Sequence, residues 1–236
     1  MSLFQDLQVE TDIKPVEDRV GGDFSRVDKT GLYNFTIEKA FAGQSDSGAY
    51  SVTIHFKEDN GAKFNVTEYI TSGSAKGCKN YYLDKNGNKN YLPGYNKIKN
   101  LDALIGFDRA YPKTTKGKIM LYDFDAKSEL PVEKEVITEW IGKKVSALII
   151  KRLEDKYSNP TEIATKFEVE HFLDYTTKQT RNEKVAGLNG FKDKWLDKHN
   201  EEFVIDKRVE SKNAVAGTPL SSSSDVTEDD DVPFNF

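Results

Sequence analysis

Three segments in the first third of the chain alternate between apolar and polar residues, which is typical of strands with one buried face. The first is GLYNFTIEKAF at 31–41, where Tyr33, Phe35 and Ile37 share a face. The second, AYSVTIHFK at 49–57, places four apolar side chains on one face, namely Tyr50, Val52, Ile54 and Phe56. The third is FNVTEYIT at 64–71, and the Asn60-Gly61 pair before it is a strong hairpin signal. The pattern predicts a meander of strands that belongs to a small sheet or barrel.

Further along the chain, the pattern predicts helices and more strands. A short helix is expected at 95–107, with Ile98, Leu101 and Leu104 at helical spacing. Strands are expected at 118–124, 134–140, 143–153 and 165–176, and a closing helix at 190–203. Trp140 and Trp195 are expected to be core residues.

These elements predict a mainly β protein of the α+β class. Residues 1–30 are interpreted as an N-terminal arm, 31–206 as one folded domain, and 207–236 as a disordered linker and acidic tail. An OB-fold-like β-barrel with added strands and short helices accounts for the domain. A β-sandwich accounts for it nearly as well, and the pattern does not separate the two.

Charge divides the chain more sharply than hydropathy does. It has 236 residues with 34 basic and 39 acidic side chains and a formal net charge of −5. From Ser221 onward there are five acids and no Lys or Arg, so the rest of the chain holds 34 of each sign. Such acidic blocks are usually interaction tails. A single cysteine, Cys78, excludes an internal disulfide, and no apolar run approaches the ~20 residues of a membrane span. We therefore expect a cytoplasmic protein without a signal peptide or membrane contact.

The stretch 76–99, KGCKNYYLDKNGNKNYLPGYNKIK, combines lysines with tyrosines. Asn86-Gly87 predicts a hairpin with a two-residue turn, which pairs Tyr82 with Tyr91 and places both rings on one face. Rings that stack on bases and ammonium groups that follow phosphates are what a sequence-tolerant site for single-stranded nucleic acid requires. A purely structural role explains this stretch as well as nucleic-acid binding does, since tyrosine is common in strands and lysines protect hairpin edges. The candidate DNA-binding residues are Lys76, Lys79, Tyr81, Tyr82, Lys85, Lys89, Tyr91, Tyr95, Lys97 and Lys99. Tyr95 is expected to be displayed by a tight turn after the hairpin.

Other candidate chemistry is weaker. Asp123, Asp125 and Glu129 provide carboxylates for a possible metal-dependent nuclease, although a strand's solvated face explains the first two more simply. A second basic run either extends the predicted nucleic-acid site or keeps strand ends hydrated. It comprises Lys143, Lys144, Lys151 and Arg152. No Cys or His pair has zinc-ligand spacing, and no cofactor or metal is expected.

The end of the chain, EDDDVPFNF, joins an acid run to two phenylalanines. DDDVPF resembles the C-terminal tip of bacterial single-stranded DNA-binding proteins, which follows a linker and docks onto replication and repair partners. One departure is that Asn235 and Phe236 follow the Phe at which the bacterial tip stops. The residues expected to bind a partner are Asp229, Asp230, Asp231, Val232, Pro233, Phe234 and Phe236.

The body is similar to single-stranded DNA-binding proteins of tailed bacteriophages. The resemblance is carried by NYYLDKNGNKNYLPGYN and by the opening ETDIKPVEDRVGG, and it runs patchily over residues 8–206. It implies an OB-type fold and non-catalytic binding of single-stranded DNA in phage replication, recombination and repair. It also implies tail contacts with phage or host replication proteins, such as a polymerase or helicase-primase, in the cytoplasm of an infected bacterial host. The alternatives are the nuclease above and an interaction protein whose acids mimic DNA.

Overall fold

A single antiparallel sheet with one parallel strand forms the centre of the molecule. The computed structural model describes residues 27–156 and 159–208. The predicted meander comprises β1 (Gly31–Gln44), β2 (Tyr50–Glu58) and β3 (Lys63–Tyr69), and its β2–β3 turn lies at the expected Asn60-Gly61 position. β8 (Lys144–Lys156) pairs with β1, with β9 (Asn159–Leu173) and, in parallel, with β10 (Val204–Asp206). The expectation of a mainly β protein with short helices is confirmed.

Most of the alternating positions form the core as predicted, although Tyr33 is only partly buried and Tyr50 is exposed. Phe35 and Ile37 of β1 and Val52 of β2 are fully buried, as are the remaining inward residues of β2. Tyr50 is 47% exposed because it is the first residue of β2 and lies at the sheet's end. Val27 and Thr30, placed in the arm by the sequence, are also buried.

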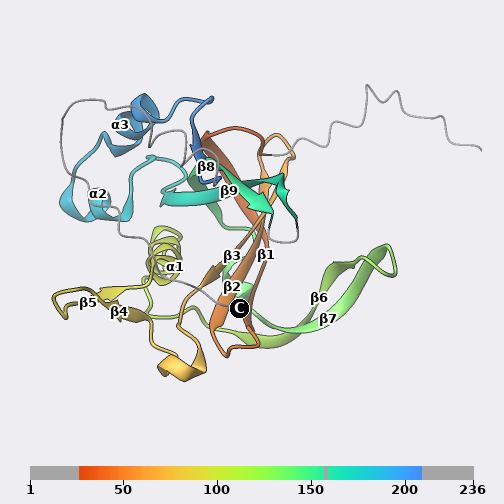
Figure 1. Ribbon diagram of the computed structural model, residues 1–236. Coiled ribbons are helices and arrows are strands. Elements are labelled where there is room, and N and C mark those ends of the chain that lie inside the picture. The colour runs from red at the N-terminus through yellow and green to blue at the C-terminus, as the bar shows by residue number, and fades with distance from the viewer. Residues whose placement is uncertain (1–26, 157–158, 209–236) are drawn as a thin grey trace, which may run out of the picture.

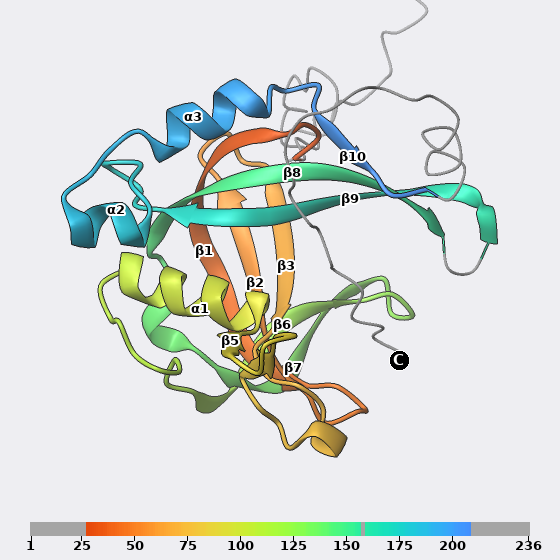
Figure 2. The same ribbon diagram turned by 60° about the vertical axis from the view of Figure 1, so that its left-hand side comes forward.

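Strand β8 is buried on both faces, which explains its unbroken apolar run. Val145, Ala147 and Ile149 face the main core, while Leu148 and Ile150 pack in a second cluster with Trp195. Trp195 belongs to α3 (Phe191–Lys198), the predicted closing helix, which covers this side of the sheet (Figure 2). The expectation that both tryptophans are core residues is confirmed, since Trp140 is also fully buried.

The described strands do not form the expected closed barrel. Among these residues, β3 pairs only with β2, and β9 pairs only with β8. Helix α1 (Pro93–Leu104) lies beside both strands and occupies one end of the β3 edge (Figure 2). A Cβ on Gly94 would lie 2.2 Å from the carbonyl oxygen of Tyr69, so only glycine permits this approach. The OB-type barrel is therefore not shown, although the strand meander remains.

Several elements differ from the prediction in their ends or their existence; β9, for example, begins at Asn159 rather than at 165, and β10 was not predicted. β7 (Ser128–Val136) ends earlier than the expected 134–140 strand, because the chain turns into a 3₁₀ helix at Thr138–Trp140. Helix α2 (Arg181–Ala186) was not predicted; Thr180 and Glu183 form a capping box at its start.

A two-stranded ribbon, β6 (Thr115–Asp123) with β7, projects from the body (Figure 1). Among the described strands, the ribbon pairs with the rest of the sheet where β7 meets β1, at Phe41 and Ala42. Lys39 also reaches the ribbon, donating to the carbonyl oxygen of Met120 at 2.5 Å and to Glu129 at 2.9 Å. Within the described ranges, no helix is both long and apolar enough to cross a membrane.

Candidate nucleic-acid interface

The predicted hairpin forms, but with another register. β4 (Tyr81–Leu83) and β5 (Lys89–Tyr91) pair Tyr81 with Tyr91, Tyr82 with Asn90 and Leu83 with Lys89. The predicted Tyr82–Tyr91 pair is wrong, and so is the two-residue turn.

Asp84 explains the different register. Its carboxylate accepts hydrogen bonds from the backbone amides of Asn86 at 2.9 Å and Asn88 at 2.8 Å. These bonds close a wider loop in which Gly87 takes the left-handed conformation, with φ of 80°. Hydrogen bonds, first from the Asn88 side chain, hold the pKa of Asp84 below its usual value.

The new register creates a surface that the sequence did not predict. Tyr81 and Tyr91 are opposite one another and therefore share a face, while Tyr82 lies on the other face with Asn90. The Nζ atoms of Lys79 and Lys89 lie 5.8 and 4.9 Å from the centroid of the Tyr81 ring. The Nζ atom of Lys99 lies 5.4 Å from the centroid of the Tyr91 ring. We call Tyr81, Tyr91 and these lysines the tyrosine platform.

Tyr95 supports the platform from below and is not displayed. It lies in α1, which begins at Pro93, and is only 3% exposed. The expectation that a tight turn displays Tyr95 is therefore wrong, because Pro93 starts a helix at its first position instead. The Tyr95 ring contacts Tyr91 at 4.9 Å and Tyr111 at 5.5 Å between centroids.

The remaining lysines of the stretch have different positions. Lys97 forms a partly buried ion pair with Glu68 at 2.9 Å, which ties α1 to β3. Burial raises the pKa of Glu68, and Lys97 opposes that shift. Lys76 lies in a short 3₁₀ helix, and Lys85 in the hairpin loop. Lys97 is thus committed to the fold, whereas Lys79, Lys89 and Lys99 surround the rings.

The sequence did not predict an apolar groove of about 570 Å³, whose described lining contains no residue of the tyrosine platform. Tyr50 and Tyr111, each 47% exposed, line it together with Pro112. The ring of Tyr111 contacts the ring of Tyr95, which in turn contacts the ring of Tyr91 in the platform. Tyr111 lies in a loop without periodic pattern, so no sequence signal marked it.

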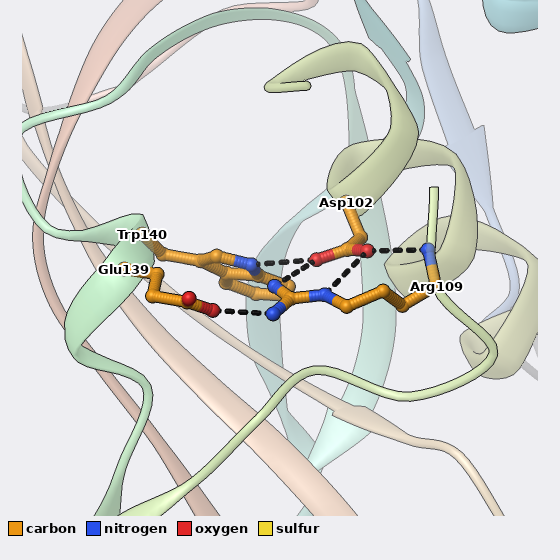
Figure 3. A network of polar contacts seen from close by, with 4 residues as sticks. All are labelled: Asp102, Arg109, Glu139 and Trp140. Carbon is orange, nitrogen blue, oxygen red and sulfur yellow. Dashed lines mark hydrogen bonds and ion pairs between the residues drawn. The ribbon is translucent and has the colours of Figure 1, made fainter. Parts of the chain in front are cut away.

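A buried polar network fixes the loop that carries Tyr111 (Figure 3). The carboxylate of Asp102, 1% exposed, accepts from Trp140 Nε1 at 2.9 Å and from the Arg109 backbone amide and Nη2, each at 2.8 Å. Arg109 also pairs with Glu139. The hydrogen bond to Asp102 raises the pKa of Arg109 above its usual value. The network anchors the end of α1 to the core and positions the segment that follows it.

Two of the three carboxylates proposed for a nuclease have structural contacts in the ribbon. Asp123 Oδ1 accepts from the backbone amides of Asp125 at 2.9 Å and Ala126 at 2.8 Å, which closes the β6–β7 turn. Glu129 pairs with Lys39. Over the described ranges, no group of three or more His, Cys, Asp or Glu side chains is arranged to hold a metal ion.

The second basic run is dispersed along and beside β8. Lys143 and Lys144 lie over the rings of Phe107 and Tyr175, at 5.7 and 4.8 Å from the centroids. Arg152 forms an ion pair with Glu168 at 3.1 Å. The residues predicted to bind a partner, Asp229 to Phe236, lie outside the described residues.

Comparison with models of known protein families found no match, and comparison with curated protein sequences found none either.

Proposed function

We propose that the protein binds single-stranded DNA without sequence preference and without catalysis. The observation that supports this most strongly is the tyrosine platform, where two rings share one face and three ammonium groups lie within 6 Å of their centroids. Any base offers a π-face to an aromatic ring, so stacking tolerates every sequence. The lysines supply the phosphate contacts that dominate affinity.

When DNA binds, a base is expected to replace the lysine ammonium group on each tyrosine ring, because stacking is the stronger interaction. A lysine over an exposed ring contributes about 0.5–1 kcal/mol. A base stacked on the ring contributes about 1–3 kcal/mol, so the base displaces the ammonium group. The displaced ammonium group remains beside the ring, within reach of the backbone phosphates. The platform therefore holds its ammonium groups close to the expected positions of the DNA phosphates.

The biological setting follows from the resemblance to phage single-stranded DNA-binding proteins. In this proposal the protein acts in DNA replication, recombination and repair in the cytoplasm of an infected bacterium. Its acidic tail binds replication proteins of the phage or host, such as a polymerase or helicase-primase. The acids bring the tail to basic patches, and the terminal phenylalanine rings provide the apolar anchor.

Equilibrium binding of labelled oligonucleotides tests the proposal. Single-stranded DNA of mixed sequence is expected to bind more tightly than duplex of the same length, at two salt concentrations, and to stay intact when Mg²⁺ is added. Preference for duplex contradicts the proposal. Shortening of the strand by the purified protein indicates the nuclease instead, and absence of binding even after tail removal indicates a DNA mimic.

A further inference from the structure

The tip of the β6–β7 ribbon exposes two aromatic rings that contact one another. Phe124 is 85% exposed and Tyr122 is 54% exposed, and their ring centroids lie 5.2 Å apart in an edge-to-face arrangement. Asp123 closes the turn that carries Phe124, because its carboxylate accepts from the backbone amides of Asp125 and Ala126. The ribbon projects from the body, so no other described element covers these rings (Figure 1). Exposed apolar side chains that cluster within a polar rim mark surfaces that bind other proteins.

An apolar groove lies at the other end of the ribbon, at its base. It is the groove of about 570 Å³ that Tyr50 lines, and its lining also includes Thr114, next to the start of β6, and Glu135 of β7. Val52 and Ile70, which line it too, are buried in the main core. Sites that hold a drug-sized molecule have volumes of about 300–1,000 Å³. The groove is therefore large enough for the two rings of a ribbon tip.

The charges beside the tip and beside the groove are of opposite sign. The turn of the ribbon carries Asp123 and Asp125 against one lysine, Lys127. Lys79 and Lys113 are exposed, and each is the chain neighbour of a residue that lines the groove. The described lining itself contains one charged residue, a glutamate, which the two lysines outnumber. Opposite charges on two surfaces steer their encounter and fix their orientation, so the tip and the groove complement one another in charge as well as in shape.

The ribbon carries its tip away from the groove at its own base. β6 has nine residues, and a rise of ~3.3 Å per residue places Asp123 about 26 Å from Thr115 along the strand. We propose that the ribbon tip inserts Tyr122 and Phe124 into the groove of a second copy of this chain. Tip and groove are different surfaces, so the contact is heterologous. This inference does not rest on DNA binding, because the described lining of the groove contains no residue of the tyrosine platform.

Sedimentation velocity of the full chain, without DNA, tests the inference. The sedimentation coefficient is expected to rise with protein concentration as monomers associate. The tip variant, Tyr122→Ala with Phe124→Ala, should weaken this association at least about tenfold, the factor that burial of one aromatic ring contributes. The matched control, Val185→Ala with Leu188→Ala, removes side chains that are 82% and 61% exposed on and beside α2, and should leave association unchanged. A full chain that stays monomeric at its highest soluble concentration overturns the proposal, and so does an equal loss in the tip variant and the control.

Variants of the groove complete the test. Tyr50→Asp removes a ring from the groove and places a carboxylate where the acidic tip docks, so it should weaken self-association as the tip variant does. Thr114→Glu, at an exposed loop position of the lining, is a second groove variant with the same expectation, and thermal melting checks that both stay folded.

Mixing the variants distinguishes a tip-in-groove contact from any other. The tip variant keeps an intact groove and each groove variant keeps an intact tip, so an equal mixture of the two should associate again. A mixture in which both folded variants stay monomeric contradicts the proposal. Groove variants that self-associate as the full chain does assign the tip to another surface and also overturn it.

Discussion

The β4–β5 hairpin and the β6–β7 ribbon both display aromatic rings to solvent, but the charges around these rings differ. On the hairpin, Tyr91 is 48% exposed, and lysine side chains lie over the rings of Tyr91 and Tyr81. On the ribbon, Tyr122 and Phe124 are 54% and 85% exposed, and they stand among Asp123, Asp125 and Glu129. Carboxylates repel a phosphate backbone, and lysines attract it. Exposed rings alone therefore do not identify a nucleic-acid surface, and the proposal for the hairpin depends also on the positive charge beside its rings.

Support beneath the rings also separates the two regions. The hairpin rests on Tyr95 and, through α1, on the buried Asp102 network. The ribbon meets the sheet at two residue pairs and through Lys39. Removal of the network should thus affect the hairpin side of the molecule most.

Asp102→Ala is expected to have the largest effect on the protein. It leaves Arg109 and Trp140 without their buried acceptor, and breaking a buried ion pair costs about 3–5 kcal/mol. The free energy of unfolding from urea titration measures the loss. Glu139→Gln is the control, because its side chain is 41% exposed and should cost under ~1 kcal/mol. Similar losses for both variants contradict the assignment of Asp102 as the anchor.

Substitution of the platform rings is expected to affect binding rather than folding. Tyr81→Ala and Tyr91→Ala should each weaken single-strand affinity by about 1–3 kcal/mol, the contribution of one stacked base. Tyr122→Ala and Phe124→Ala on the ribbon should leave affinity unchanged within error. Fluorescence anisotropy gives the affinities and thermal melting checks the fold. The comparison fails if the ribbon variants lose as much affinity as the platform variants.

Substitution of the lysines should change the salt dependence of binding. Each phosphate contact contributes about −0.7 to the slope of log K against log salt for a single strand. Lys89→Gln and Lys99→Gln should each flatten the slope by about that amount. Lys97→Gln should not, because Lys97 is held by Glu68. An unchanged slope for Lys89→Gln and Lys99→Gln assigns the phosphates to Lys143 and Lys144 instead.

Removal of the tail should have the smallest effect, and only at low salt. If the protein binds DNA as proposed, the acids of residues 225–236 should compete with DNA for the same lysines at an effective concentration of order millimolar. Deletion should therefore tighten single-strand binding at low salt, and the gain should shrink as salt screens the competition. Phe234→Ala with Phe236→Ala keeps the acids and should leave DNA affinity unchanged while it abolishes binding to a replication partner. Full partner binding by this double variant shows that the rings are not the anchor.

The sequence predicts the strands better than it predicts the site. Alternation in β2 and in the first half of β1 identifies their buried faces, because one-sided burial leaves a period of two. The hairpin was found but its register was not, since Asp84 widens the turn and a shift of one residue moves every side chain to the other face. Tyr81 thus replaces Tyr82 as the partner of Tyr91.

Long-range packing accounts for the rest. Burial of Tyr95, the pairing of Lys97 with Glu68 and the network at Asp102 all join segments that lie far apart in the chain, or arise where a helix replaces an expected turn. The spacing of apolar and polar residues within one segment does not predict contacts between distant segments. Likewise, alternation does not show whether β3 and β9 meet, so the closed barrel was a prediction that the described strands do not bear out.

Photo-crosslinking tests the central claim most directly. The full chain is bound to a single-stranded oligonucleotide that contains 5-iodouracil, irradiated, digested, and mapped by mass spectrometry. Crosslinks at Tyr81 and Tyr91 are expected, because a stacked base lies against the ring that reacts, and the exposed rings of Tyr122 and Phe124 should remain unmodified. Crosslinks confined to the β6–β7 ribbon, with none between residues 79 and 99, would contradict the account.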